Sequence, residues 1–140
     1  NEAMLTMLPD ATKEQALAEY RRVLVPGGTV LTHDVMLDRE NDNVIRMLQK
    51  VINVPSQPLT RAGWEAAFER AGLVVADVKT GAFTLLSDEG LARDEGVEGR
   101  DQLYQNALAD DNFAQFSEMK TFFDLAKGDI SYIVVVGTRP

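Results

Sequence analysis

The sequence predicts an α/β fold, and three observations support this. Apolar residues at helical spacing alternate with short runs rich in β-branched residues, such as 29–35 and 130–136. A Pro-Gly-Gly turn at 26–28 joins the end of one helical pattern to the first of these runs. The length of 140 residues and the apolar content of 45% suit one domain with a real core. A complete doubly wound nucleotide-binding domain usually needs more chain.

The first helix and strand follow from capping and turn chemistry. Thr12 and Gln15 have the spacing of a capping box, which predicts a helix over 13–24. Leu17, Tyr20 and Leu24 form the stripe of this helix that would pack on a sheet. Pro26 and Gly27 suit the two central positions of a type II turn, so a strand over 29–35 is expected after it.

Two more helices and a strand are expected next. Asp42 can cap the second helix, which Pro55 and Pro58 end. Its broad apolar face consists of Val44, Ile45, Met47, Leu48, Val51 and Ile52. Thr60 is the expected cap of the third helix and Gly72 its C-terminal glycine, before a strand over 73–79.

The pattern from 81 to 128 is polar and helical, with a mobile loop expected over 87–100 because Gly90, Gly96 and Gly99 interrupt it. A helical stripe of core residues follows: Phe113, Phe116, Met119, Lys120 and Phe123. The final run, 130–136, is rich enough in β-formers to predict a strand buried on both faces.

Two stretches resemble class I S-adenosylmethionine-dependent methyltransferases. The run 22–28, Arg-Val-Leu-Val-Pro-Gly-Gly, resembles the turn before the family's fifth strand, with Val25 in place of the usual Lys. Leu59-Thr60, Trp64 and the run 68–73 resemble the segment before strand six in many small-molecule methyltransferases. The resemblance spans nearly the whole chain and its two parts occur in the expected order.

The resemblance implies an α/β fold that is the C-terminal half of a Rossmann-like methyltransferase. Residues 1–140 would then be the distal part of a single domain, holding strands five and six with an antiparallel strand seven inserted between them. Residues 81–128 would be a helical insertion or cap over the substrate. The family's fourth strand would end just before Asn1, and its glycine-rich loop would lie further upstream.

The implied activity is methyl transfer from S-adenosylmethionine to a nucleophilic atom of a small-molecule acceptor, with the isolated chain inactive. In the family, the loop after strand four contacts the cofactor or the acceptor. By resemblance, Asn1, Glu2 and Ala3 are the candidate cofactor-binding residues and Met4 is a candidate substrate-binding residue. The alternative for these residues is a frayed, hydrated terminus.

His33, the single histidine, is the candidate catalytic residue, because an imidazole with an ordinary pKa of about 6.5 can take a proton from a hydroxyl or amine acceptor. It is expected at the carboxyl end of its strand, where ligands bind in open α/β sheets. His33 and Asp34 are both candidate substrate-binding residues. Neighbouring strand residues point to opposite faces, so a direct dyad is not expected. The alternative is a packed histidine bonded to a backbone carbonyl.

Composition narrows the function classes. The chain has 22 acidic against 14 basic residues, a net charge of −8, and no basic face of the kind nucleic-acid binding needs. With no cysteine, a disulfide framework or a cysteine metal site is excluded, and with one histidine no transition-metal site is expected. No apolar run approaches the roughly 20 residues of a membrane span. A cytoplasmic location is the simplest expectation.

Two alternatives remain open at this point. One is a cofactor-free interaction or dimerisation module, in which the exposed edge of the strand at 29–35 pairs with a second copy. The other is the distal half of a nicotinamide-dependent Rossmann protein, which has no antiparallel last strand between strands five and six. Strand order therefore distinguishes this second alternative.

Overall fold

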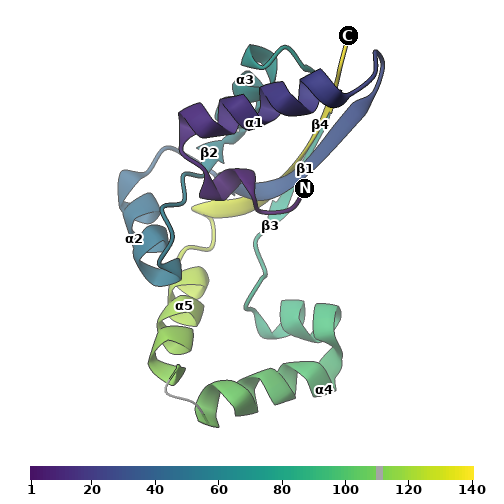
Figure 1. The fold of residues 1–140 in the computed structure, drawn as a ribbon. Coiled ribbons are helices and arrows are strands. Elements are labelled where there is room, and N and C mark those ends of the chain that lie inside the picture. Colours follow the sequence, from purple (N-terminus) through teal and green to yellow (C-terminus); the bar gives the residue numbers. More distant parts are fainter. Residues whose placement is uncertain (110–111) are drawn as a thin grey trace.

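A four-stranded sheet with helices on both sides forms the body of the protein in the computed structural model, which describes residues 1–109 and 112–140 (Figure 1). The strands are β1 (Thr29–Leu37), β2 (Leu59–Thr60), β3 (Val74–Ala82) and β4 (Ile130–Thr138). The helices are η1 (Leu5–Met7), α1 (Asp10–Val23), α2 (Asp42–Ile52), α3 (Arg61–Arg70), α4 (Asp88–Ala109) and α5 (Phe113–Leu125).

The strand order is β2-β1-β4-β3. The last strand, β4, lies between β1 and β3 and runs antiparallel to both, as the sequence predicts. The short β2, which was not predicted, pairs in parallel with the end of β1. Because β4 is antiparallel and central, the nicotinamide-dependent alternative is excluded.

The Pro-Gly-Gly turn has the predicted geometry. Gly27 has φ +76°, and the Gly28 amide donates to the Val25 carbonyl at 2.8 Å. Arg139, just beyond β4, fixes this turn through two backbone bonds: its carbonyl accepts from Gly27 and its amide donates to Gly28. The turn therefore joins α1 to β1 and also holds the end of the sheet.

The start of α1 differs from the prediction. The helix begins at Asp10 after Pro9, so Thr12 lies inside it and forms no capping box. The side chain of Gln57 accepts a hydrogen bond from the Asp10 amide at 3.1 Å and so performs the capping. A contact across 47 residues has replaced the local motif, which sequence spacing alone could not reveal.

The caps of α2 and α3 follow the sequence more closely. Asn41, not Asp42, caps α2 by accepting from the Asn43 and Val44 amides. Thr60 caps α3 as predicted, accepting from Gly63, and Gly72 takes φ +76° after the helix end. Both β1 and β3 run further than predicted, to Leu37 and Ala82.

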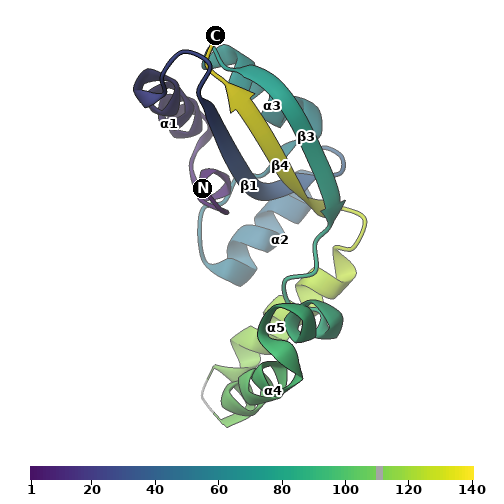
Figure 2. The same cartoon turned by 90° about the vertical axis from the view of Figure 1, so that its right-hand side faces the viewer.

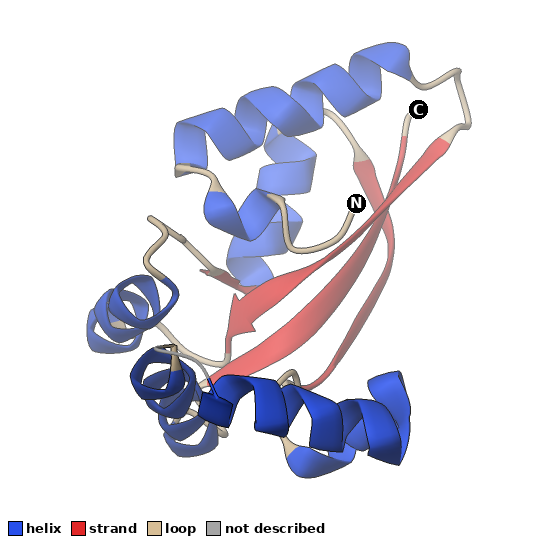
Figure 3. Ribbon diagram, turned by 60° about the horizontal axis from the view of Figure 1, so that its bottom comes forward, coloured by secondary structure: helices blue, strands red, loops and turns tan. Residues whose placement is uncertain are grey.

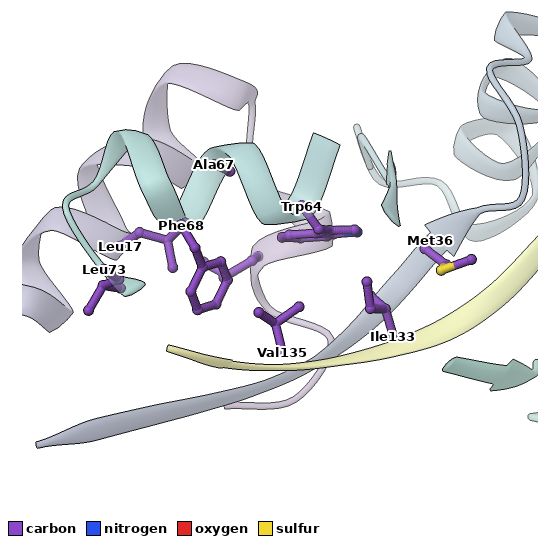
Figure 4. Close-up of a cluster of buried hydrophobic side chains, with 9 residues drawn as sticks. Leu17, Met36, Trp64, Ala67, Phe68, Leu73, Ile133 and Val135 are labelled. Carbon is purple, nitrogen blue, oxygen red and sulfur yellow. The ribbon is translucent and has the colours of Figure 1, made fainter. Parts of the chain in front are cut away.

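One face of the sheet is covered by α1 and α3 (Figure 4). Trp64 and Phe68 of α3 pack there with Leu17 of α1 and with Ile133 and Val135 of β4. On the opposite face, α2 and α5 cover only the end of the sheet around Leu37 and Ile130.

The prediction that the last strand is buried on both faces is wrong, because the second face is only partly covered. Tyr132, Val134 and Val136 of β4 point to it and are only half-buried, so β4 is not buried on both faces.

The segment after β3 forms two helices and no long loop. Figure 2 shows α4 and α5 projecting together from one end of the sheet, and Figure 3 shows helices on both sides of the strands. The loop predicted over 87–100 is wrong: α4 continues through it, with a break at Gly96, where φ is +75° and ψ 166°. Of the predicted stripe on α5, Phe123 is buried, whereas Phe113 is exposed.

Replacing Gly27 tests the turn. Gly27→Ala forces a side chain into the left-handed region and should lower the free energy of unfolding by about 1–2 kcal/mol. No atom lies within 4 Å of the added Cβ, so any loss reports backbone strain and not a clash. Gly27→Asn should lose clearly less, because Asn tolerates this conformation. Urea unfolding measures both variants, and equal losses for the two would contradict the assignment.

Candidate functional site

Residues 1–3 pair in parallel with the middle of β1 through an isolated bridge between Glu2 and His33. The His33 amide donates to the Asn1 carbonyl at 3.0 Å, and the Ala3 amide donates to the His33 carbonyl at 2.6 Å. The Asn1 nitrogen also approaches the Leu31 carbonyl at 3.3 Å. The candidate cofactor-binding residues are therefore tied to the strand that carries His33, and they do not form a frayed end.

The turn that follows is strained and firmly held. Ala3 has φ +50°, a conformation that costs a non-glycine residue of the order of 1 kcal/mol. Next along β1, the Val35 amide donates to Thr6 Oγ1 and the Val35 carbonyl accepts from Trp64 Nε1, both at 3.1 Å. The outer edge of β1 is thus occupied from His33 to Val35, which removes most of the exposed edge that the dimerisation alternative requires.

His33 lines a cavity of about 620 Å³ between the open sheet face and the start of α4. Its imidazole meets the Tyr132 ring edge to face, with centroids 5.3 Å apart. Tyr132 in turn lies against Gly81, where an added Cβ would come within 2.7 Å of the ring. His33 lies in the middle of β1, not at its carboxyl end as predicted, because the strand continues to Leu37.

Glu2 supplies the charged partner that the sequence did not reveal. Its Oε1 lies 3.6 Å from Nδ1 of His33, and both side chains are accessible, at 81% and 42% exposure. Both residues line the cavity. The residues are 31 positions apart, so only the pairing of residues 1–3 with β1 brings them together. The resemblance to strands four and five of the methyltransferases is the signal that could have predicted this pair.

Asp34 points to the opposite face, as strand alternation predicts, and is 2% exposed. Its Oδ1 accepts from the amide and the hydroxyl of Thr6, both at 2.9 Å. Burial raises the pKa of the Asp34 carboxyl above its usual value near 3.8, against the lowering effect of the bonds from Thr6. The sheet separates this carboxyl from the cavity, so the structure does not place Asp34 where the predicted substrate contact requires it.

A buried lysine completes the polar contacts beneath the sheet, and sequence reasoning missed it. Lys13 is 1% exposed; its Nζ donates to Asp10 at 2.9 Å and to the Gln57 carbonyl at 2.7 Å, and it lies 5.2 Å from the Trp64 ring centre. These bonds hold α1 and the loop before β2 against α3. Lys13 lies four residues before Leu17 and so on the same face of the helix, but lysine is rarely buried, which is why the sequence pattern did not identify it.

The far wall of the cavity comes from α4 and the loop before it. Arg93 is paired with Asp94 through two hydrogen bonds and also donates to Thr84. Phe83 and Leu85 add apolar surface. Asn1, Ala3 and Met4 adjoin this region through the pairing with β1 but do not line the cavity.

Residues 1–109 and 112–140 contain neither a candidate metal centre nor a candidate membrane span. Within these ranges no group of three or more His, Asp and Glu side chains is arranged to hold a metal ion. Of the described helices, none has the length and apolarity needed to cross a membrane.

The chain is similar in sequence to a curated protein. The chain is 46% identical over 126 residues to an uncharacterized protein of Haemophilus influenzae, a match that covers 89% of this chain and 50% of that protein. The chain thus spans about half the length of the relative. No family model matches the sequence.

Solved structures resemble the fold over nearly the whole chain. The MccD protein matches 99% of the chain with a TM-score of 0.69 and 16% identity, over 57% of its own length. A phospholethanolamine N-methyltransferase from Haemonchus contortus, in complex with phosphomonomethylethanolamine and S-adenosylhomocysteine, matches 99% (TM-score 0.64, 14% identity, 32% of its length). A geranyl diphosphate methyltransferase in complex with S-adenosylmethionine matches 100% (TM-score 0.60, 16% identity, 49% of its length). The chain has a methyltransferase-like fold, as the sequence resemblance implies.

Asp34→Asn tests the buried carboxyl. Because the raised pKa lets the folded state bind this proton more readily than the unfolded chain, the group's contribution to wild-type stability is full below about pH 3.8 and declines as pH rises through the raised pKa. The side-chain amide of the variant does not titrate in this pH range, and its oxygen can still accept the hydrogen bonds from Thr6. Its stability relative to the wild type should therefore increase from pH 3.5 to 7 in urea unfolding. A constant or decreasing difference would contradict the assignment.

Proposed function

We propose that the chain acts in S-adenosylmethionine-dependent methyl transfer to a small-molecule acceptor, as the C-terminal half of a methyltransferase domain. In this proposal β1, β3 and β4 correspond to strands five, six and seven. Residues 1–3 directly follow strand four, and α4 with α5 forms a cap beside the acceptor. The protein is a soluble cytoplasmic enzyme, and the chain alone lacks the cofactor-binding half and is inactive.

The observation that carries the proposal is the position of Glu2 and His33 in one cavity, produced by the parallel pairing of residues 1–3 with β1. In open α/β sheets ligands bind where the carboxyl ends of parallel strands leave a crevice. The parallel pairing of residues 1–3 with β1 ends beside His33, and the proposed crevice opens at that point of β1. Structures of similar fold that hold S-adenosylmethionine or S-adenosylhomocysteine support the choice of cofactor.

Asn1, Glu2 and Ala3 are the residues proposed to contact the cofactor. Their polar groups suit its amino-acid end, because a carboxylate accepts hydrogen bonds from an ammonium group and an amide can donate to a carboxylate. The backbone from Asn1 to Ala3 is held in place by β1, so these groups are positioned before a ligand binds. When bound, S-adenosylmethionine supplies a methyl group on a positively charged sulfur. Met4 would contact the acceptor from the same turn.

His33 is proposed as the general base. Glu2 faces Nδ1 at 3.6 Å, which favours a proton on that nitrogen and leaves Nε2 to receive the proton of a hydroxyl or amine acceptor. Tyr132 holds the ring from the side. The reaction also needs alignment of the acceptor with the methyl group and exclusion of water, and α4 with α5 is the proposed cap for both.

Cofactor binding is the first test of the proposal. The longer natural polypeptide, expressed with the reading frame upstream of Asn1, should bind S-adenosylhomocysteine in isothermal titration calorimetry with an affinity in the micromolar range. Residues 1–140 alone should show no binding at the same concentrations, because most of the cofactor contacts lie in the other half. Absence of binding to the longer polypeptide would refute the methyltransferase assignment.

Variants of the Glu2–His33 pair test the assigned chemistry. With an acceptor that stimulates release of S-adenosylhomocysteine, His33→Gln in the longer polypeptide should lower kcat by about 10²-fold or more, the usual contribution of a general base. Glu2→Gln should lower kcat less, by about tenfold, since it removes only the charged partner. Unchanged kcat in His33→Gln would exclude the general-base role while leaving the fold and cofactor binding intact.

A further inference from the structure

We propose that the cavity between the open sheet face and α4 binds a small organic ammonium ion, so that the methyl acceptor is an amine. This inference rests on the proposed function for its catalytic meaning. The binding itself depends only on described residues of this chain. Three features of the cavity support it: the sign of its charge, its aromatic wall and the position of a proton acceptor.

The charged groups of the lining favour a cation. They are the carboxylates of Glu2 and Asp94 and the guanidinium of Arg93. Arg93 is already engaged by both carboxylate oxygens of Asp94 and by Thr84, so its charge is compensated within the protein. Glu2 is then the one carboxylate of the lining without a guanidinium partner among the described residues. An anionic ligand would meet no uncompensated positive charge from these side chains.

Charged residues near the cavity do not change its preference for a cation. Asp77 and Lys79 lie on the same face of the edge strand β3, opposite Val136 and Val134 of β4, and their charges are of opposite sign. Over the whole chain the net charge is −8, which raises the local concentration of cations and disfavours anions. The field of the protein and the local lining therefore act in the same direction.

The aromatic wall gives a cation a second source of affinity. Tyr132 and Phe83 both line the cavity, and Tyr132 is kept in place between His33 and Gly81. The faces of aromatic rings attract ammonium groups, by about 0.5–1 kcal/mol at accessible sites. Val134 and Leu85 supply apolar contact for the carbon part of the ligand. The volume of about 620 Å³ suits a small molecule.

An amine acceptor also explains why a base belongs in this cavity. An ammonium nitrogen has no free electron pair and cannot attack a methyl group. It first transfers one proton to Nε2 of His33; its freed pair then forms the new N–C bond while the C–S bond of the methyl donor breaks, and that bond's electron pair remains on sulfur. The proton later leaves His33 to solvent.

Three probes with the same phenyl ring and different charge test the inference without any cofactor: 2-phenylethylamine, 2-phenylethanol and 3-phenylpropanoate. Ligand-observed NMR titration of residues 1–140 should give the tightest binding for the amine, by about 3–10-fold over the alcohol, and the weakest for the carboxylate. Equal binding of the three probes, or tighter binding of the carboxylate, would overturn the proposal.

Two variants locate the site. The Glu2 side chain is 81% exposed, so Glu2→Gln should leave the fold unchanged. It should reduce the preference for the amine over the alcohol about threefold. Tyr132→Leu should reduce it by a similar factor. Glu118→Gln on α5 and Tyr104→Leu on α4 are the matched controls, because neither residue lines this cavity, and both should retain the wild-type preference. A loss of preference in the controls but not in Glu2→Gln would place the amine elsewhere and refute this site.

The outcomes separate this inference from the proposed function. If the longer polypeptide binds S-adenosylhomocysteine but the amine shows no preference, the acceptor class is wrong and the methyltransferase assignment stands. If the amine binds selectively but the longer polypeptide binds no S-adenosylhomocysteine, the cavity is a cation site and the methyl-transfer role is refuted.

Discussion

The contact between Thr6 and Asp34 is the interaction on which the rest of the structure depends. Thr6 places its amide and hydroxyl on a buried carboxylate of β1 and uses the same hydroxyl to accept from the next amide of that strand, Val35. A buried carboxylate without such bonds would be costly, so the sheet and the N-terminal turn are stable only together. The pairing of Asn1 and Ala3 with His33, and with it the Glu2–His33 pair, follows from this attachment.

The parts of the fold set by short-range chemistry were predictable from the sequence. The turn at Gly27, the cap at Thr60 and the stripe of α1 around Leu17 each depend on neighbouring residues, and the structure confirms them. The resemblance to methyltransferases added the place of β4 between β1 and β3, which no local pattern specifies. The helix across 87–100 was missed because three glycines usually mark a loop, whereas here the helix accommodates them with a break at Gly96.

The candidate site was only partly predictable. His33 was identified because it is the single histidine, and strand alternation correctly separated it from Asp34. Its partner Glu2, the buried Lys13 and the capping of α1 by Gln57 all join residues more than 30 positions apart in sequence or depend on burial set by other elements. No spacing rule carries that information. The pairing of distant segments in the folded chain determines which side chains lie close together, and sequence spacing does not show that pairing.

The side chains of strand β1 point alternately to the two faces of the sheet, and the two faces have different roles. Thr32, Asp34 and Met36 are buried under η1, α1 and α3, while Leu31 and His33 face the open side. Adjacent positions are thus under separate constraints, one set by folding and the other by ligand choice. Substitutions at the open positions can alter what the protein accepts without disturbing the buried contacts. The alternation of a single strand therefore gives this protein room to evolve new specificities at little cost in stability.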